Sequence, residues 1–295
     1  MEYTIPSVRI DVPPSFRKLL NNVLSQYLEI APKVGTTTLI FWVEGGVTKM
    51  ISENLRKRIR MTYELLNDIQ GVRLKMQARE RALGKADICI EVKELQELER
   101  RLQRSLKEMI KDLPIYREFL SNIPGIGIVS SAGLIAYFDP HKAQHISSFW
   151  KRAGLHVVNG KAARRTAGQK SDFNPKIKSF VLYRIGMNFL RVKTPYYSDL
   201  YEKYKQLENE KLNNPIENPK NCPYYEECRK KTNKTPACKM HVHLRALRRM
   251  VKRFLADLWI VWRKLEGLPI TKPYAVEKLG HHMEVSPYVE RFVKG

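Results

Sequence analysis

The hydrophobic pattern predicts two long helices in the first half of the chain. Between residues 92 and 113, apolar residues recur at spacings of three and four, and charged residues fill the positions between them. This spacing is typical of a coiled-coil seam or a helical hairpin. The apolar positions are Leu95, Leu98, Leu102, Leu106, Met109 and Leu113. A partner helix is expected earlier, on Leu55, Ile59, Leu65, Leu66, Ile69, Val72 and Met76. If residues 48–113 join two chains, the protein is a homodimer or a higher oligomer; otherwise the two helices pack together within one chain.

Further helices are expected in the second half, so the predicted fold class is mainly α. Residues 241–266 place seven apolar residues on one face and a stripe of basic residues on another. A shorter helix is expected from about 176 to 192, and near the N-terminus a helix over 16–29 precedes a possible strand over 36–43. The expected division is an N-terminal segment at 1–47, long coiled-coil-like helices at 48–113, a nucleic-acid-binding domain at 114–268 with a polar insertion at 206–240, and an irregular tail at 269–295.

The charge of the chain favours a polyanionic partner. Lysine and arginine number 53 against 30 aspartates and glutamates, which gives a net charge of +23. DNA is the first candidate and RNA the second, while a solvated basic surface is the alternative. The sequence has no apolar run long enough for a transmembrane helix and no signal peptide, so no membrane partner is expected. Its four cysteines are too few for a disulfide scaffold, which indicates a reducing compartment. With DNA as the first candidate partner, the expected location is cytoplasmic and nucleoid-associated.

A glycine-containing turn at residues 123–127 is a candidate phosphate site. The sequence Ile-Pro-Gly-Ile-Gly follows an apolar helix end and precedes a run of small residues, as in a helix–hairpin–helix unit. Glycines permit a tight turn and close approach of a ligand, and the N–H groups that begin the next helix attract phosphate. Gly125, Ile126 and Gly127 are therefore predicted to contact nucleic acid. The alternative is an ordinary tight turn between two helices.

Two basic segments supply the other candidate contacts. Residues 154–193 hold nine lysines and arginines against one acid, Asp172, and a loop at 159–175 leads into the helix beyond it. Such a loop can follow a phosphate backbone without reading bases. The candidates are Lys161, Arg164, Arg165, Lys170, Lys176, Lys178 and Arg184 from this segment, and Arg245, Arg248, Arg249 and Lys252 from the basic stripe of the last helix. For that stripe, a solvated face is an equal alternative.

The polar insertion contains a candidate structural zinc site. Cys222, Cys228, Cys238 and His241 supply three thiolates and one imidazole, and His243 is an alternative fourth ligand. This donor set suits tetrahedral Zn²⁺, which would hold a segment that has too few apolar residues to form a core. The alternatives are three unrelated reduced cysteines or a single disulfide.

From about Leu95 to Pro269, the chain resembles the C-terminal half of the DEDD-type insertion-element transposases. This is the "IS-one-ten" family, which includes RNA-guided bridge recombinases. The resemblance is carried by the leucine-rich helix that runs into residues 123–127, by residues 149–155 (FWKRAGL), and by the late helix over 251–262. It implies a two-part enzyme, in which an N-terminal RNase-H-like domain holds Mg²⁺ on four carboxylates. The C-terminal domain then supplies a serine that attacks the DNA phosphate.

The sequence departs from that family pattern in both catalytic parts. Fewer than 100 residues precede the leucine-rich helix, and Asp11, Glu44, Asp87 and Glu91 are the candidates for a compressed carboxylate set. Asn159 stands where the family has its serine, and Ser171 lies farther along the loop. We therefore expect a nucleic-acid-binding protein derived from a transposase, without catalysis and with little sequence specificity. An active Mg²⁺-dependent transposase or recombinase and an RNA-binding scaffold of a ribonucleoprotein are the alternatives.

Overall fold

The computed structural model divides the chain into two units, residues 1–39 and 40–295, and every described residue belongs to the second. The described residues are 41–43, 46–48, 51–84, 90–158, 161–165, 168–211, 225–226, 238–271 and 286–293. The helix expected over 16–29 therefore lies outside them, as does most of the strand expected over 36–43. The described part of the chain is mainly helical, as predicted.

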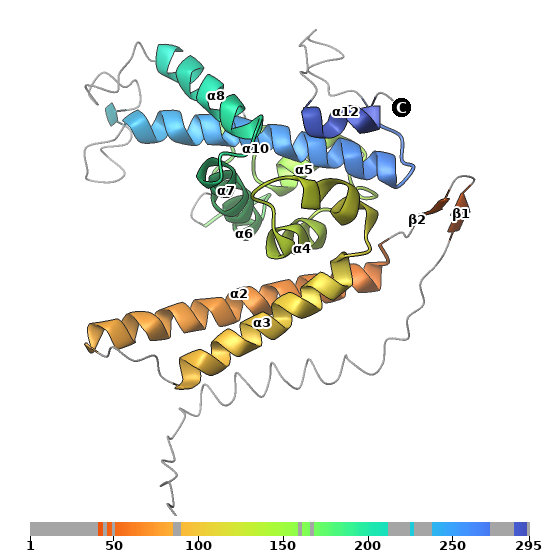
Figure 1. Ribbon diagram of the computed structural model, residues 1–295. Helices are drawn as coiled ribbons and strands as arrows, with labels where there is room; N and C mark the ends of the chain where they lie inside the picture. The colour runs from red at the N-terminus through yellow and green to blue at the C-terminus, as the bar shows by residue number, and fades with distance from the viewer. Residues whose placement is uncertain are drawn as a thin grey trace, which may run out of the picture. The chain divides into compact units, whose positions relative to one another are not determined.

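Two long helices, α2 (Glu53–Ala82) and α3 (Ile90–Ile110), form a hairpin within one chain (Figure 1). Helix α2 begins at Ser52, whose hydroxyl accepts a hydrogen bond from the N–H of Leu55 at 3.1 Å. Leu95, Leu102 and Leu106 of α3 are buried, and Arg73 of α2 donates to the buried Glu99 at 2.5 Å. The apolar seam predicted for residues 92–113 thus packs against its own neighbour in the chain.

A short buried helix, α4 (Ile128–Tyr137), packs against this hairpin. It follows the π-helix η1 (Ile115–Phe119) and the 3-10 helix η2 (Leu120–Asn122) and precedes α5 (Ile146–Arg152). A Cβ atom on Gly133 would lie 2.7 Å from Phe180 Cζ and 2.8 Å from Tyr63 Cζ, so glycine permits the close approach. Tyr63, Tyr137 and Phe180 meet edge to face beside it, at centroid distances of 5.6 to 5.8 Å.

The helix expected over 176–192 consists of three successive segments. These are α6 (Pro175–Ser179), the π-helix η3 (Phe180–Gly186) and α7 (Met187–Arg191). Asn174 caps the first segment by accepting from the N–H of Lys176 at 2.9 Å, and Pro175 occupies the first helical position. The apolar pattern predicts the extent of this helical stretch but contains no signal for the wider turn at its centre.

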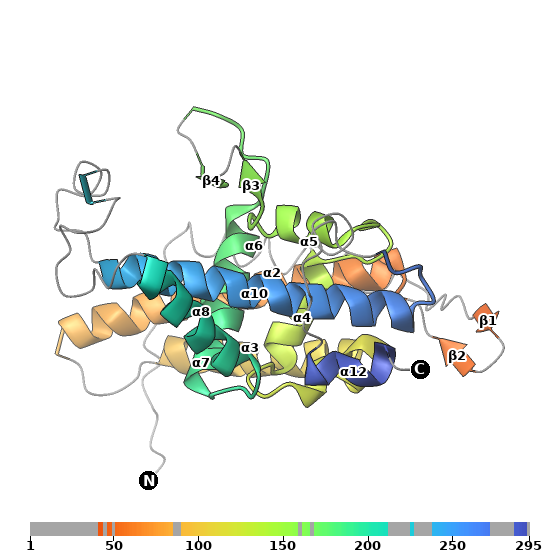
Figure 2. The ribbon, with the colours of Figure 1, turned by 90° about the horizontal axis from the view of Figure 1, so that it is seen from above.

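The long helix α10 (Cys238–Leu265) packs against α5, α8 (Tyr197–Lys211), η3 and α12 (Pro287–Val293) (Figure 2). Its apolar face is buried and includes Trp259 and Trp262. The presence of α12 corrects the prediction of an irregular tail at 269–295. Ser286 begins this helix by accepting from the N–H of Tyr288 at 3.3 Å, and Phe292 meets Phe119 edge to face. Seven residues are too few for a periodic signal.

The described residues contain two short antiparallel pairs of strands. β1 (Phe41–Val43) pairs with β2 (Gly46–Thr48), and β3 (Val157–Val158) pairs with β4 (Lys161–Ala162) at the start of the basic loop. Among the described helices, none has the length and apolar character needed to cross a membrane.

Candidate nucleic-acid interface

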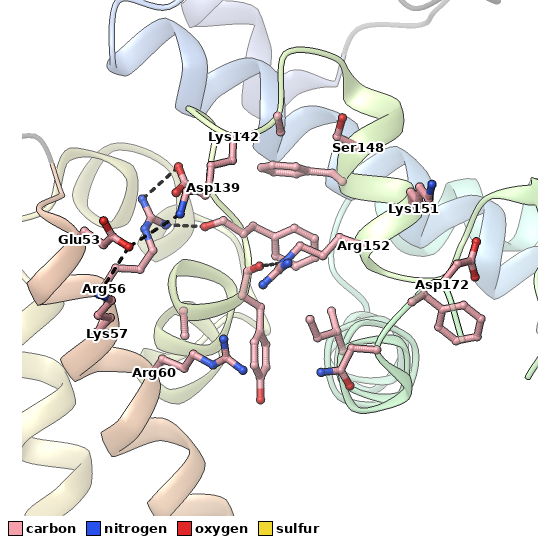
Figure 3. A pocket seen from close by; sticks show the side chains of 18 of the residues that line it. Glu53, Arg56, Lys57, Arg60, Asp139, Lys142, Ser148, Lys151, Arg152 and Asp172 are labelled. Carbon is pink, nitrogen blue, oxygen red and sulfur yellow. Dashed lines mark hydrogen bonds and ion pairs between the residues drawn. The ribbon is translucent and has the colours of Figure 1, made fainter. Parts of the chain in front are cut away.

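A cavity of about 930 Å³ lies between α2 and α5 and is lined by more cations than acids (Figure 3). We call it the cationic groove. Its charged lining residues are the cations Arg56, Lys57, Arg60, Lys142, Lys151 and Arg152 and the acids Glu53, Asp139 and Asp172. Figure 3 shows the labelled α2 residues on one side of the cavity and the labelled α5 residues on the other. Six cations against three carboxylates give the groove a positive character.

Two of these arginines are held by the end of α4. Arg56 donates to the carbonyl oxygen of Ile135 at 2.9 Å and lies 3.5 Å from Asp139, while Arg152 donates to the carbonyl oxygen of Tyr137. Burial lowers the pKa of both guanidiniums below the usual value for arginine. Cations at a helix C-terminus satisfy its last carbonyl groups and interact favourably with its dipole. Arg56 and Arg152 therefore fix the base of the groove.

The other cations of the groove are exposed and weakly held. Lys57 and Lys142 have side-chain exposures of 70% and 74%, and both share Glu53, at 3.6 and 3.9 Å. Arg60 pairs with Glu64 on its own helix at 3.0 Å, and Lys151 is exposed on α5. Exposed ion pairs contribute little to stability, so these cations can exchange a carboxylate for a phosphate at small cost.

Ser171 and Asp172 line one side of the groove, where their side chains form local hydrogen bonds. The hydroxyl of Ser171 donates to the carbonyl oxygen of Phe173 at 2.9 Å. Asp172 Oδ2 lies 2.7 Å from His156 Nε2, so this carboxylate holds the imidazole in place. A serine nucleophile needs a base within hydrogen-bond reach. The geometry thus gives Ser171 the role of a turn residue.

The turn at 123–127 is partly covered by the chain itself. Gly125 has a φ of +89°, and a Cβ there would lie 2.9 Å from Val192 Cγ2. The hydroxyl of Thr194 donates to the carbonyl oxygen of Pro124 at 2.7 Å, and Ile126 is buried. Gly127 is exposed and has open space at its Cβ position. The close approach that Gly125 permits is therefore made by the chain's own 192–194 turn, while Gly127 faces outward at the start of α4.

Internal contacts engage the basic stripe of α10, for which the sequence left nucleic-acid contact and a solvated face as alternatives. Arg245 and Arg249 both donate to the buried Glu208 of α8, at 3.2 and 3.1 Å. Arg248 donates to the carbonyl oxygen of His156 at 2.7 Å, and the ammonium of Lys252 lies 4.1 Å from the ring centroid of Trp150. The reason is tertiary, because α8 and the segment before β3 cover this side of α10. The side chains of these cations therefore connect α10 to α8, to α5 and to the segment before β3.

Lys252 makes stability depend on pH. Burial, reinforced by the nearby Arg248, lowers its pKa from 10.5 to about 8. Between these values the unfolded chain binds more protons at this side chain than the folded chain, so raising the pH should favour folding. Lys252→Met removes the titration. We expect the free energy of unfolding, measured in denaturant from pH 8 to 10.5, to rise less in the variant than in the unaltered protein. The same pH dependence in both proteins would contradict the burial of a charged lysine.

The candidates of the basic loop and the following helix divide into three groups. Arg164, Arg165 and Lys170 are exposed on the loop, and Lys161 lies in β4 with its side chain outside the described residues. Lys178 is engaged internally, because its ammonium donates to the carbonyl oxygen of Ala163 at 2.8 Å. The remaining two, Lys176 and Arg184, line a second cavity of about 920 Å³.

The candidate metal ligands fall largely outside the described residues. Asp11, Glu44, Asp87, Cys222 and Cys228 are in this group, as is the side chain of Cys238. Glu91 lies half-buried in the first turn of α3 and His241 half-buried on α10, while His243 Nδ1 lies 2.6 Å from the hydroxyl of Tyr201. Within the described ranges, no three histidine, cysteine or carboxylate residues gather as a metal site. Zinc and magnesium therefore stay predictions.

Sequence reasoning missed the cations of α2. In the run Leu55-Arg-Lys-Arg-Ile-Arg60, only the apolar Leu55 and Ile59 entered the sequence prediction, as part of a partner helix. A local signal existed, since four basic residues in six are a dense positive patch. Comparison of the chain with protein-family models, with curated proteins and with solved structures finds no match.

Proposed function

We propose that the protein binds nucleic acid, with DNA as the first candidate, through the cationic groove. The observation that carries this proposal is the placement of exposed cations from separate elements around one cavity. Lys57 and Arg60 come from α2, Lys142 from the loop after α4, and Lys151 from α5. Cations that face a common groove can neutralise successive phosphates of one strand.

Phosphate contact accounts for the affinity in this proposal, and little base sequence is read. Lysine ammonium groups are point charges that bind phosphate oxygens without distinguishing the bases. The net charge of +23 adds long-range attraction for any polyanion. RNA shares the phosphate chemistry and is the second candidate, and the exposed Arg164, Arg165 and Lys170 of the basic loop extend the positive surface in either case.

We further propose that binding, without catalysis, is the activity, and that the chain derives from a transposase of the family it resembles. The order of the leucine-rich helix, the 123–127 turn and the late helix supports the proposed origin. The engagement of the Ser171 hydroxyl with the Phe173 carbonyl supports the proposed lack of catalysis.

Removing one groove lysine should change the salt dependence of binding by a defined amount. Each neutralised phosphate contributes about 0.7 to 0.9 to the slope of log affinity against log salt concentration. Lys151→Ala should therefore reduce the magnitude of the slope by about that amount, measured by fluorescence anisotropy with a labelled oligonucleotide. Lys107→Ala, which removes an exposed lysine of α3, is the matched control and should leave the slope unchanged. A slope that Lys151→Ala does not alter would count against the groove.

A further inference from the structure

The second cavity lies next to the cationic groove and shares a lining residue with it. Tyr137 lines both cavities, and α2 contributes to the wall of each, through Arg60 in the first and Tyr63 in the second. The second cavity, of about 920 Å³, is bounded by α2, α6 and η3. A strand that follows the cations of the groove along α2 would therefore arrive at this cavity.

The lining changes from cationic to aromatic between the two cavities. Tyr63, Tyr137 and Phe180 line the second one and hold one another in edge-to-face contact. Tyr183 also lines it and is 55% exposed, so its ring is not used to fill the core. Burial raises the pKa of Tyr137 to about 12, so its hydroxyl stays protonated and available as a donor. Aromatic side chains that offer a face to solvent are the usual platforms for nucleobases.

Polar groups surround this aromatic lining. Asp68 lines the cavity and supplies a carboxylate, and Asn188 supplies an amide whose NH2 group also donates to the carbonyl oxygen of Gly125 at 3.5 Å. Carboxylates and amides are the groups that pair with the edges of bases. Lys176 and Arg191 also line it and are exposed, so cations remain beside the aromatic surface. Arg184 donates to Asn67 Oδ1 at 2.9 Å, which ties η3 to α2 across the cavity. The cavity therefore combines a stacking face, base-edge partners and phosphate partners.

We infer that this cavity, which we call the aromatic pocket, holds an unstacked base of a single-stranded nucleic acid. The inference rests on the proposed function, because the phosphates of the same strand lie in the cationic groove. A base within a duplex is stacked on both faces and paired along its edge, so it reaches a side pocket only after it leaves the helix. A single strand offers its bases without that cost. The protein therefore binds single strands more tightly than duplexes of the same sequence.

The test compares single-stranded and duplex forms of one labelled 20-nucleotide DNA at the same salt concentration. Stacking of a base on one aromatic side chain corresponds to about five- to 150-fold in affinity. Tyr183→Ala should weaken single-strand binding by that factor and leave duplex binding within about twofold. Tyr183→Phe keeps the ring and is the matched control, which should bind single strands as the unaltered protein does. In the unaltered protein, a DNA carrying 5-iodouracil should crosslink to the peptide that contains Tyr183, a measurement that needs no variant.

The outcomes separate this inference from the proposed function. Equal binding of single strands and duplexes, or a Tyr183→Ala variant that weakens both or neither, would overturn the aromatic pocket. If Lys151→Ala still reduces the salt slope in that case, the cationic groove stands and only the pocket is lost. If the unaltered protein binds neither form of the DNA, the proposed function fails and the inference fails with it.

Discussion

Replacing Lys57, Lys142 and Lys151 together with glutamate should weaken binding to nucleic acid by on the order of a hundredfold or more at low salt. The three side chains line one groove and are exposed. Each substitution removes a phosphate contact and adds a negative charge that repels the strand. Because the side chains face solvent, the fold should be retained. Fluorescence anisotropy with a labelled oligonucleotide measures the loss, and thermal unfolding checks the fold.

The matched control makes the same change of net charge elsewhere. Lys93 and Lys107 of α3 and Lys264 of α10 are exposed lysines that do not line the cationic groove. Their triple replacement with glutamate lowers the overall positive charge equally, so it reports long-range attraction alone. We expect a much smaller loss of affinity in this control. A similar loss in both triple variants would mean that net charge, and not the groove, attracts the ligand.

Trp259→Ala should lower the free energy of unfolding by about 3 to 5 kcal/mol, the usual cost of truncating a fully buried large aromatic residue. Trp259 has no exposed surface, and its indole N–H donates to the carbonyl oxygen of Ala143 at 2.8 Å. The guanidinium carbon of Arg263 lies 5.2 Å from its ring centroid. Truncation leaves a cavity in the core and removes one of the two hydrogen bonds that the carbonyl oxygen of Ala143 accepts, since Arg263 also donates to it at 3.0 Å. Urea unfolding measures the change.

The same measurement on Tyr183→Ala provides the contrast. Tyr183 is 55% exposed, so its truncation should change the free energy of unfolding by less than about 1 kcal/mol. The two variants therefore compare, in one assay, the loss of a buried aromatic side chain with the loss of an exposed one. A Trp259→Ala variant as stable as the unaltered protein would contradict the packing of α10 described above.

The helices predicted from apolar spacing are those that bury a continuous face. In α3, Leu95, Leu102 and Leu106 recur at intervals of four and seven and are all buried. In α10 the apolar residues also repeat with the helical period, and the described structure confirms both helices. Such spacing is a local property, because residues three or four apart share one face of a helix whatever the rest of the chain does. Helix α12 was missed because seven residues carry no such repeat.

The functional surface depends on contacts that no local pattern contains. Arg245 and Arg249 form a basic stripe in the sequence, but Glu208, more than 35 positions earlier, engages both of them. Conversely, Lys57 belongs to a helix that the pattern assigns to a coiled coil, yet it faces the same cavity as Lys151 of α5. The charge of a residue can be read from the sequence. Its partners depend on which helices pack together, and this arrangement was not predicted.

The most direct test of the cationic groove is acetylation of lysines in the free and the oligonucleotide-bound protein, read by mass spectrometry. The ammonium groups of Lys57, Lys142 and Lys151 should react in the free protein and become protected when DNA is bound, because phosphates occupy the groove. Lys93, Lys107 and Lys264 should react equally in both states. Protection confined to Lys161 and Lys170 of the basic loop, with the three groove lysines unchanged, would contradict the account.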